Sequence, residues 1–173
     1  MVVAVSDPRT ERIAESLDYV EIQRLQSAYA DVVTRRAWSE LAELFRPDAR
    51  VEVDTRRDEV LVFDGPAALG AFISGAIERF GFFEFVILNT RVEVGVNGDP
   101  DAAAGRMYMC ELRTDATSGE WTNAFGVYHD RYRRDDDRWW FEHRIYHSLA
   151  RTADAPHLAE VFEFPHHLTL GDA

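Results

Sequence analysis

Four long segments in the second half of the sequence alternate apolar and polar residues as β-strands do, and this pattern constrains the fold more than any other feature. The segments are FEFVILNTRVEV, AGRMYMCELRT, WTNAFGVYHDRYRR and WWFEHRIYHSLA. The stretches between them, GVNGDPDAA, DATSGE and DDD, are short and rich in turn-forming residues. Short turns between alternating segments are typical of hairpins. The four segments therefore predict an antiparallel meander.

Helical patterns precede the predicted meander. Residues 18–36 place apolar side chains on one face at helical spacing, and WSELAELF, from Trp38, continues as a second short helix. In DGPAALGAFISGAIERF, Asp64 is placed to cap a third helix and Pro66 fits its first turn. Two short strands, ARVEVDT and VLVF, lie between the helices. Helices followed by a large sheet predict an α+β layer architecture.

The composition limits the partners that the chain can have. The formal net charge is −12, and every positively charged side chain other than histidine is arginine. Nucleic acids and anionic membranes require a basic surface, so neither is expected as a partner. Cys110 is the only cysteine, no uncharged apolar run approaches the roughly 20 residues of a membrane helix, and the first residues do not resemble a signal peptide. These features predict a cytoplasmic protein.

The order of elements resembles the SnoaL-like branch of the nuclear transport factor 2-like superfamily, over residues 18–150. IQRLQSAYADVVTRRAWSELAELFRPDARVEV is similar to the opening helix pair and first strand of that family, and GVYHDRYRRDDDRWWFEHR is similar to its closing hairpin. The resemblance implies an α+β cone, in which a curved, mainly antiparallel sheet wraps around about three helices and an apolar pocket lies at the open end. We expect one domain over residues 1–173, with a core at 18–150 and a C-terminal tail at 151–173.

The same resemblance implies roles for several side chains of the first helix and the strand that follows the third. Tyr29 occupies the place of a pocket tyrosine that donates a hydrogen bond to a substrate oxygen, so we expect it to be catalytic; a core tyrosine at the helix–sheet seam is the alternative. Thr34 and Phe85 stand where the dehydratases of the family carry a catalytic Asp–His pair, so their standard mechanism is not expected here. Asn89 is retained from the same pattern. Phe85, Asn89 and Trp38 are predicted to bind substrate.

The closing strands supply the other candidates. If Trp139 and Phe141 face the helices, strict alternation directs His143 toward the pocket, where its ordinary pKa of about 6.5 suits a general acid or base. A histidine satisfied by one hydrogen bond is the alternative. The resemblance places Tyr128 in the pocket. Asp130, on the same face, is predicted with Tyr128 to belong to the substrate-binding residues, where it either orients His143 or forms a structural ion pair.

The strand AGRMYMCELRT can place only one of two polar candidates inside. Tyr108 and Glu111 are three residues apart and therefore lie on opposite faces. We expect Tyr108 to face the pocket and to bind substrate.

No metal site and no cofactor are predicted. His143 and His147 are four residues apart on one strand, a separation of about 13 Å, which is too far for one ion. His166 and His167 are adjacent in the tail, so their rings diverge, and no cysteine pair supports them. No glycine-rich phosphate loop with its lysine is present.

Two functions remain open on the sequence. The first is binding of a hydrophobic small molecule, with lyase or isomerase chemistry of the dehydratase or cyclase type on an oxygenated ring. The second is a non-catalytic binding or assembly subunit, similar to the small subunits of ring-hydroxylating dioxygenases. For either function we expect a homodimer or homotrimer, formed through an outer sheet face that includes Trp140 and Tyr146.

Overall fold

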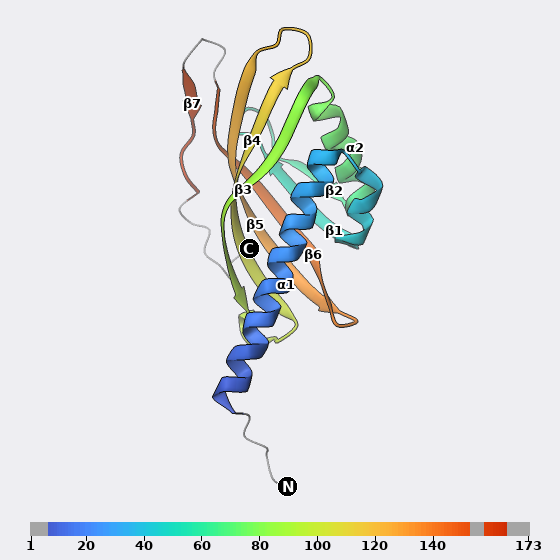
Figure 1. Cartoon of the computed structure of the whole chain (residues 1–173), viewed down its shortest axis with the longest axis vertical. Coiled ribbons are helices and arrows are strands. Elements are labelled where there is room, and N and C mark those ends of the chain that lie inside the picture. The colour runs from blue at the N-terminus through green and yellow to red at the C-terminus, as the bar shows by residue number, and fades with distance from the viewer. Residues whose placement is uncertain (1–6, 153–157, 166–173) are drawn as a thin grey trace.

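The computed structural model describes residues 7–152 and 158–165 (Figure 1). Its elements are α1 (Pro8–Arg35), the 3₁₀ helix η1 (Trp38–Glu43), β1 (Phe45–Asp54), β2 (Leu61–Asp64), α2 (Gly65–Ile77), β3 (Phe80–Val94), the 3₁₀ helix η2 (Val96–Gly98), β4 (Ala102–Asp115), β5 (Trp121–Asp135), β6 (Arg138–Thr152) and β7 (Ala159–Val161). No helix in these two ranges is both long enough and apolar enough to cross a membrane.

The strands form one curved sheet in the order β2-β1-β6-β5-β4-β3, and β7 pairs with the end of β6. Strands β3 to β6 are consecutive antiparallel neighbours, which confirms the predicted meander. The one parallel pairing described joins β1 to β6 and makes the sheet mixed. This long-range pairing brings the first strand beside the last long strand.

Helix α1 lies across the concave face of the sheet, and α2 lies beside it near β1 and β2 (Figure 1). The contact between α1 and the sheet forms the core, where the side chains of Ile22, Tyr29, Val33, Met107 and Phe141 are all at most 2% exposed. The apolar stripe predicted for α1 therefore faces inward. The expected α+β cone is confirmed.

Helix α1 begins ten residues earlier than the sequence pattern predicts. Asp7 caps it by accepting a hydrogen bond from the backbone N–H of Arg9, and Pro8 occupies its first turn. The added turns are mostly exposed, and their apolar residues Ile13 and Leu17, although at helical spacing, are 52% and 61% exposed. Asp64, predicted as a cap, makes no side-chain hydrogen bond to α2.

A β-bulge in β6 decides which of its side chains face the helices. The pairing with β5 shifts between Phe141 and His143, so Glu142 is an extra residue on β6. The inward face therefore passes from Phe141 to Arg144, both 0% exposed, and continues to Tyr146. Strict alternation from Phe141 predicts the opposite arrangement.

The described end of the tail covers part of the outer sheet face. After β7, the ring of Phe164 stacks on Tyr108 with 6.2 Å between ring centroids. Tyr108 therefore lies outside the cone, and the prediction that it faces the pocket is wrong.

Candidate functional site

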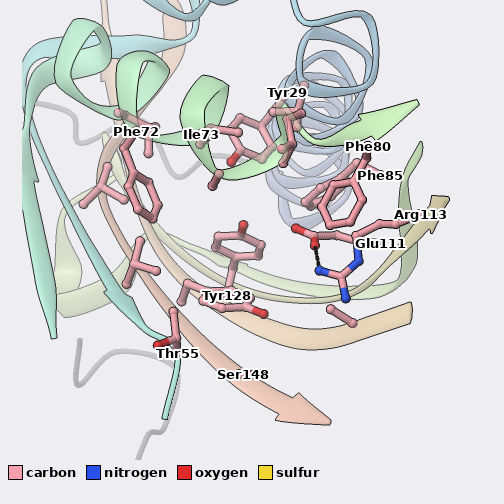
Figure 2. A pocket seen from close by; sticks show the side chains of 18 of the residues that line it. Tyr29, Thr55, Phe72, Ile73, Phe80, Phe85, Glu111, Arg113, Tyr128 and Ser148 are labelled. Carbon is pink, nitrogen blue, oxygen red and sulfur yellow. Dashed lines mark hydrogen bonds and ion pairs between the residues drawn. The ribbon is translucent and has the colours of Figure 1, made fainter. Parts of the chain in front are cut away.

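A cavity of about 180 Å³ lies between the two helices and the concave sheet (Figure 2). Most of its wall is apolar, and its polar groups come from the sheet and from Tyr29. It is lined by Tyr29, Val33, Val51, Val53, Thr55, Leu69, Phe72, Ile73, Ala76, Ile77, Phe80, Phe85, Glu111, Arg113, Ala124, Tyr128, Tyr146, Ser148 and Arg151. A concave apolar site with a few converging polar groups is the usual form of a small-molecule site.

Three phenols converge on this cavity. Tyr29 comes from α1, Tyr128 from β5 and Tyr146 from β6. Burial raises the pKa of all three hydroxyls, although the Arg144 guanidinium opposes this shift at Tyr29 and Tyr128. All three are therefore neutral hydrogen-bond donors at physiological pH.

Gly126 makes room for the ring of Tyr146. A Cβ at Gly126 would lie 2.2 Å from Cε2 of Tyr146, a separation that atoms do not reach. Because Gly126 has no side chain, the Tyr146 ring can lie against the backbone of β5 at this position.

A buried ion pair lies against the rings of Tyr29 and Tyr128. Arg144 donates to Asp130 through Nε at 2.7 Å and through Nη2 at 2.9 Å, and both side chains are 0% exposed. The guanidinium also lies 4.2 Å from the ring centroid of Tyr29, 4.3 Å from that of Tyr128 and 4.1 Å from that of Phe141. Burial alone would lower the pKa of Arg144, but Asp130 reverses the shift and keeps the cation charged.

The ion pair is tied to α1 and β3 by a chain of hydrogen bonds. The Tyr132 hydroxyl donates to Asp130 at 2.9 Å and accepts from Gln26 Nε2 at 2.8 Å. Thr90 in turn donates to Gln26 Oε1 at 2.9 Å. Asp130 is thus a structural and positioning residue beneath the cavity. Of the two roles open on the sequence, the structure places it in the ion pair.

Among the described residues, Glu111 supplies the one carboxyl group in the cavity wall. Its side chain is 22% exposed, and Arg113 Nη1 donates to its Oε2 at 3.3 Å. Burial raises the pKa of Glu111 and outweighs the opposing effect of Arg113. Figure 2 shows Glu111 and Tyr29 both directed into the cavity, from β4 and from α1. A carboxyl group with a raised pKa in a cleft is a typical general acid or base.

Glu111 could not be identified from the alternation of β4 alone, because this pattern does not show which of the two faces is inward. Since Tyr108 lies outside, the alternate residues Met107, Met109, Glu111 and Arg113 lie inside, and both methionines are 0% exposed. Two methionines at this spacing were the signal that could have identified the inward face.

His143 does not line the cavity, and the expectation that it faces the pocket is wrong. The bulge at Glu142 turns His143 to the outer face, where its Nε2 lies 3.2 Å from Oε1 of Glu52. The same bulge brings Tyr146 inside, so Tyr146 does not belong to the outer face proposed for oligomer contacts. Trp140 stays partly exposed, under the guanidinium of Arg138.

The other predicted residues divide between the cavity and its surroundings. Phe85 and Tyr128 line the cavity, as expected. Asn89 is exposed on the outer side, because Leu88 is an extra residue on β3 and shifts its register. Trp38 packs against the core from η1 but does not line the cavity.

Thr34 on α1 and Phe85 on β3 are neighbours joined by a hydrogen bond. The backbone N–H of Phe85 donates to Thr34 Oγ1 at 3.0 Å. In place of an acid–base pair, these two positions therefore supply a backbone tether and an aromatic wall.

Among residues 7–152 and 158–165, no group of three or more His, Cys, Asp or Glu side chains could hold a metal ion. His166 and His167 lie outside the described residues.

Glu111→Gln should change stability in a pH-dependent way. A raised pKa means that the folded protein binds the Glu111 proton more tightly than the unfolded chain does, whose reference value is 4.5. Wild-type stability therefore falls as the pH rises from 4.5 through the folded-state pKa, and the glutamine variant lacks this loss. Its free energy of unfolding relative to wild type should increase over that window, by about 1.4 kcal/mol for each unit of the shift. Urea unfolding between pH 4 and 8 measures this; a relative free energy that decreases with pH would mean that Arg113 outweighs burial.

Comparison with known proteins agrees with this architecture of helices inside a curved sheet around an apolar cavity. The chain belongs to the SnoaL-like domain family, whose model matches residues 14–145. No match was found among curated proteins.

Several solved structures share the fold. A hexachlorocyclohexane dehydrochlorinase, LinA-type3, from Novosphingobium barchaimii is 22% identical, with a TM-score of 0.69 over 91% of this chain and 99% of that one. A candidate scytalone dehydratase from Novosphingobium aromaticivorans is 19% identical, with a TM-score of 0.66 over 79% and 87%. An NTF2-like protein with a cystatin-like fold from the same species is 21% identical, with a TM-score of 0.64 over 83% and 90%.

Proposed function

We propose that this protein is a cofactor-independent enzyme of the lyase or isomerase type, which binds a small oxygenated ring and moves a proton on it. One observation carries the proposal: the Glu111 carboxyl, with its raised pKa, lines an apolar cavity together with three neutral phenols. Glu111 replaces His143 as the group expected to move the proton. Solved relatives described as a dehydratase and a dehydrochlorinase support the reaction class.

The proposed reaction begins at a carbon next to a ring carbonyl. Glu111 takes a proton from that carbon, and the electron pair of the C–H bond moves through the ring carbon to the carbonyl oxygen. The Tyr29 hydroxyl, with Tyr128 beside it, donates a hydrogen bond to the resulting oxyanion. Where a carbon–carbon double bond of the ring is conjugated with the enolate, Glu111 then returns the proton to the far carbon of the dienolate, and the double bond changes position. In an elimination, the electron pair instead expels a leaving group from the neighbouring carbon, and that group takes up the proton.

The size of the cavity limits the substrate. An engineered cavity of about 150 Å³ binds benzene, so a cavity of about 180 Å³ suits one substituted ring. A fused steroid or polyketide skeleton would have to extend well beyond the enclosed space. We therefore favour a monocyclic substrate.

The composition of the cavity wall favours an enzyme over a subunit that serves only in assembly. A subunit that only holds an oligomer together has no need for a carboxyl group beside three phenols in an unfilled space. The cost of desolvating Glu111 and the phenols is expected where a ligand uses them.

A deuterium-exchange assay tests this function without knowledge of the substrate. Cyclohexanone, 2-cyclohexenone and 1,3-cyclohexanedione in D₂O should exchange their α-hydrogens faster with the wild-type protein, as followed by NMR. Ala124→Phe should abolish the acceleration, because Ala124 lines the cavity and a larger ring would fill it. Ala159→Phe, on the exposed surface of β7, is the matched control and should retain it. No acceleration by the wild type on any of the three ketones would contradict the proposal.

A further inference from the structure

Beside the apolar cavity lies a second, strongly polar groove that the proposed reaction does not use. Phe80, Arg113 and Arg151 line both the cavity and the groove, so the two share a wall. The charged residues that line the groove are Arg57, Arg79, Arg113, Arg151, Asp115 and Glu120. Four cations and two anions give it a net charge of +2, in a chain whose formal net charge is −12.

Arg113 has hydrogen-bonding capacity that the protein leaves unused. Within the described part of the chain, Arg113 donates one hydrogen bond, from Nη1 to Glu111, and its Nε is buried without a partner. A guanidinium carries five N–H donors in a planar fork that matches an anionic oxygen group. A buried donor without a partner is costly unless a ligand supplies the acceptor.

Two other arginines, Arg79 and Arg151, lie near Arg113 in addition to its partner Glu111. Arg113 and Arg79 lie over the ring of Phe80, at 5.0 Å and 4.8 Å from its centroid. Burial lowers the pKa of Arg113; the Glu111 carboxylate opposes this shift, and the like charges of Arg79 and Arg151 add to it. Within the described residues, no carboxylate lies within 4.0 Å of Arg79. Such repulsion would be relieved by a bound anion.

Two acids near the arginines, Asp115 and Glu160, are already engaged. Asp115 accepts backbone hydrogen bonds from Thr117 at 2.9 Å and Ser118 at 3.0 Å, which lower its pKa. Glu160 lies 3.0 Å from Arg57 and 3.3 Å from Arg151. Arg113 and Arg79 therefore remain the cations available to a ligand at the junction of cavity and groove.

We propose that the substrate carries an anionic oxygen group, held by Arg113 and Arg79 at the mouth of the cavity, while its ring occupies the apolar space beside Glu111. This inference rests on the proposed function and narrows its substrate class to ring compounds with a carboxylate, or with a phosphate in the corresponding position. Charge–charge attraction at the mouth would fix which ring carbon faces Glu111.

Calorimetric titration with three matched ring probes tests the inference. Benzoate and phenyl phosphate each carry an anionic oxygen group, and benzamide is the neutral counterpart of benzoate. With the wild type, at least one anionic probe should bind ten-fold or more tightly than benzamide. The tighter of the two anionic probes identifies the group as carboxylate or phosphate.

Three arginine variants locate the effect. Arg113→Gln should remove the preference for the anion, and Arg79→Gln, at an exposed position, should reduce it several-fold without unfolding the protein. Arg91→Gln is the control, because it removes the same charge from an exposed site that pairs with Glu93 away from the groove. It should leave the preference unchanged.

Three outcomes would overturn the inference. Equal affinity for benzamide and for both anions would mean that the protein does not recognise an anionic group. It would not contradict the proposed ring chemistry. Absence of binding by all three probes would also overturn it, and the exchange assay on neutral ketones would then decide the proposed function separately. A preference that survives both Arg113→Gln and Arg79→Gln would place the anion elsewhere.

Discussion

Glu111→Gln should lower kcat/KM for the substrate by about 10²- to 10⁴-fold, the usual contribution of a general base. The amide fills nearly the same space and still accepts a hydrogen bond from Arg113, so the cavity should keep its shape. The loss should therefore appear mainly in kcat and much less in KM.

The pH profile of the wild type gives an independent readout. The carboxylate is the active form, so the rate should rise with pH and level off above an apparent pKa. That value should lie above the ordinary range of a glutamate, because burial raises the pKa of Glu111. Glu111→Gln should lose this rise.

Glu84→Gln is the matched control. Glu84 is exposed on β3 and does not line the cavity, so its replacement should leave kcat/KM unchanged. Turnover by Glu111→Gln that equals the wild type would remove Glu111 from the mechanism.

Asp130→Ala should destabilise the protein by about 3–5 kcal/mol, because it leaves the Arg144 cation buried without its partner. Both side chains are 0% exposed, so water cannot replace the carboxylate. For a chain of this size the melting temperature should fall by roughly 6–20 °C, at about 2–4 °C per kcal/mol. Calorimetry or circular dichroism measures the shift.

Two further variants show whether the unpaired charge causes the loss. The double replacement Asp130→Leu with Arg144→Met removes both charges and should recover most of the stability. Asp31→Ala breaks an exposed ion pair with Arg35 on α1 and should have little effect. A double variant as unstable as Asp130→Ala would mean that packing or the Tyr132 hydrogen bond is the dominant contribution.

The elements of the fold could be predicted where local pattern and tertiary environment agree. The meander followed from alternation and short turns, and the inward face of α1, with Tyr29 on it, followed from helical spacing. The parallel pairing of β1 with β6 could not be read from either strand, because it joins residues about ninety positions apart. The start of α1 was missed although Ile13 and Leu17 continue the helical spacing, because these first turns are exposed and lie outside the buried stripe.

The candidate site was predicted less well, because a single inserted residue reverses the two faces of a strand. The bulge at Glu142 moved His143 out and Tyr146 in, and the extra residue Leu88 moved Asn89 out. On β4, the alternation allowed either face to be the inward one. Only the position of the helices shows that Glu111 faces the cavity and Tyr108 faces outward.

The sequence by itself determined the order of helices and strands, the family of the fold and the absence of the Asp–His pair at Thr34 and Phe85, since these depend on residue identity and local periodicity. The tertiary structure alone decided which polar groups share the cavity. Register and bulges set the direction of each side chain, and they depend on pairings between distant strands that no local pattern encodes.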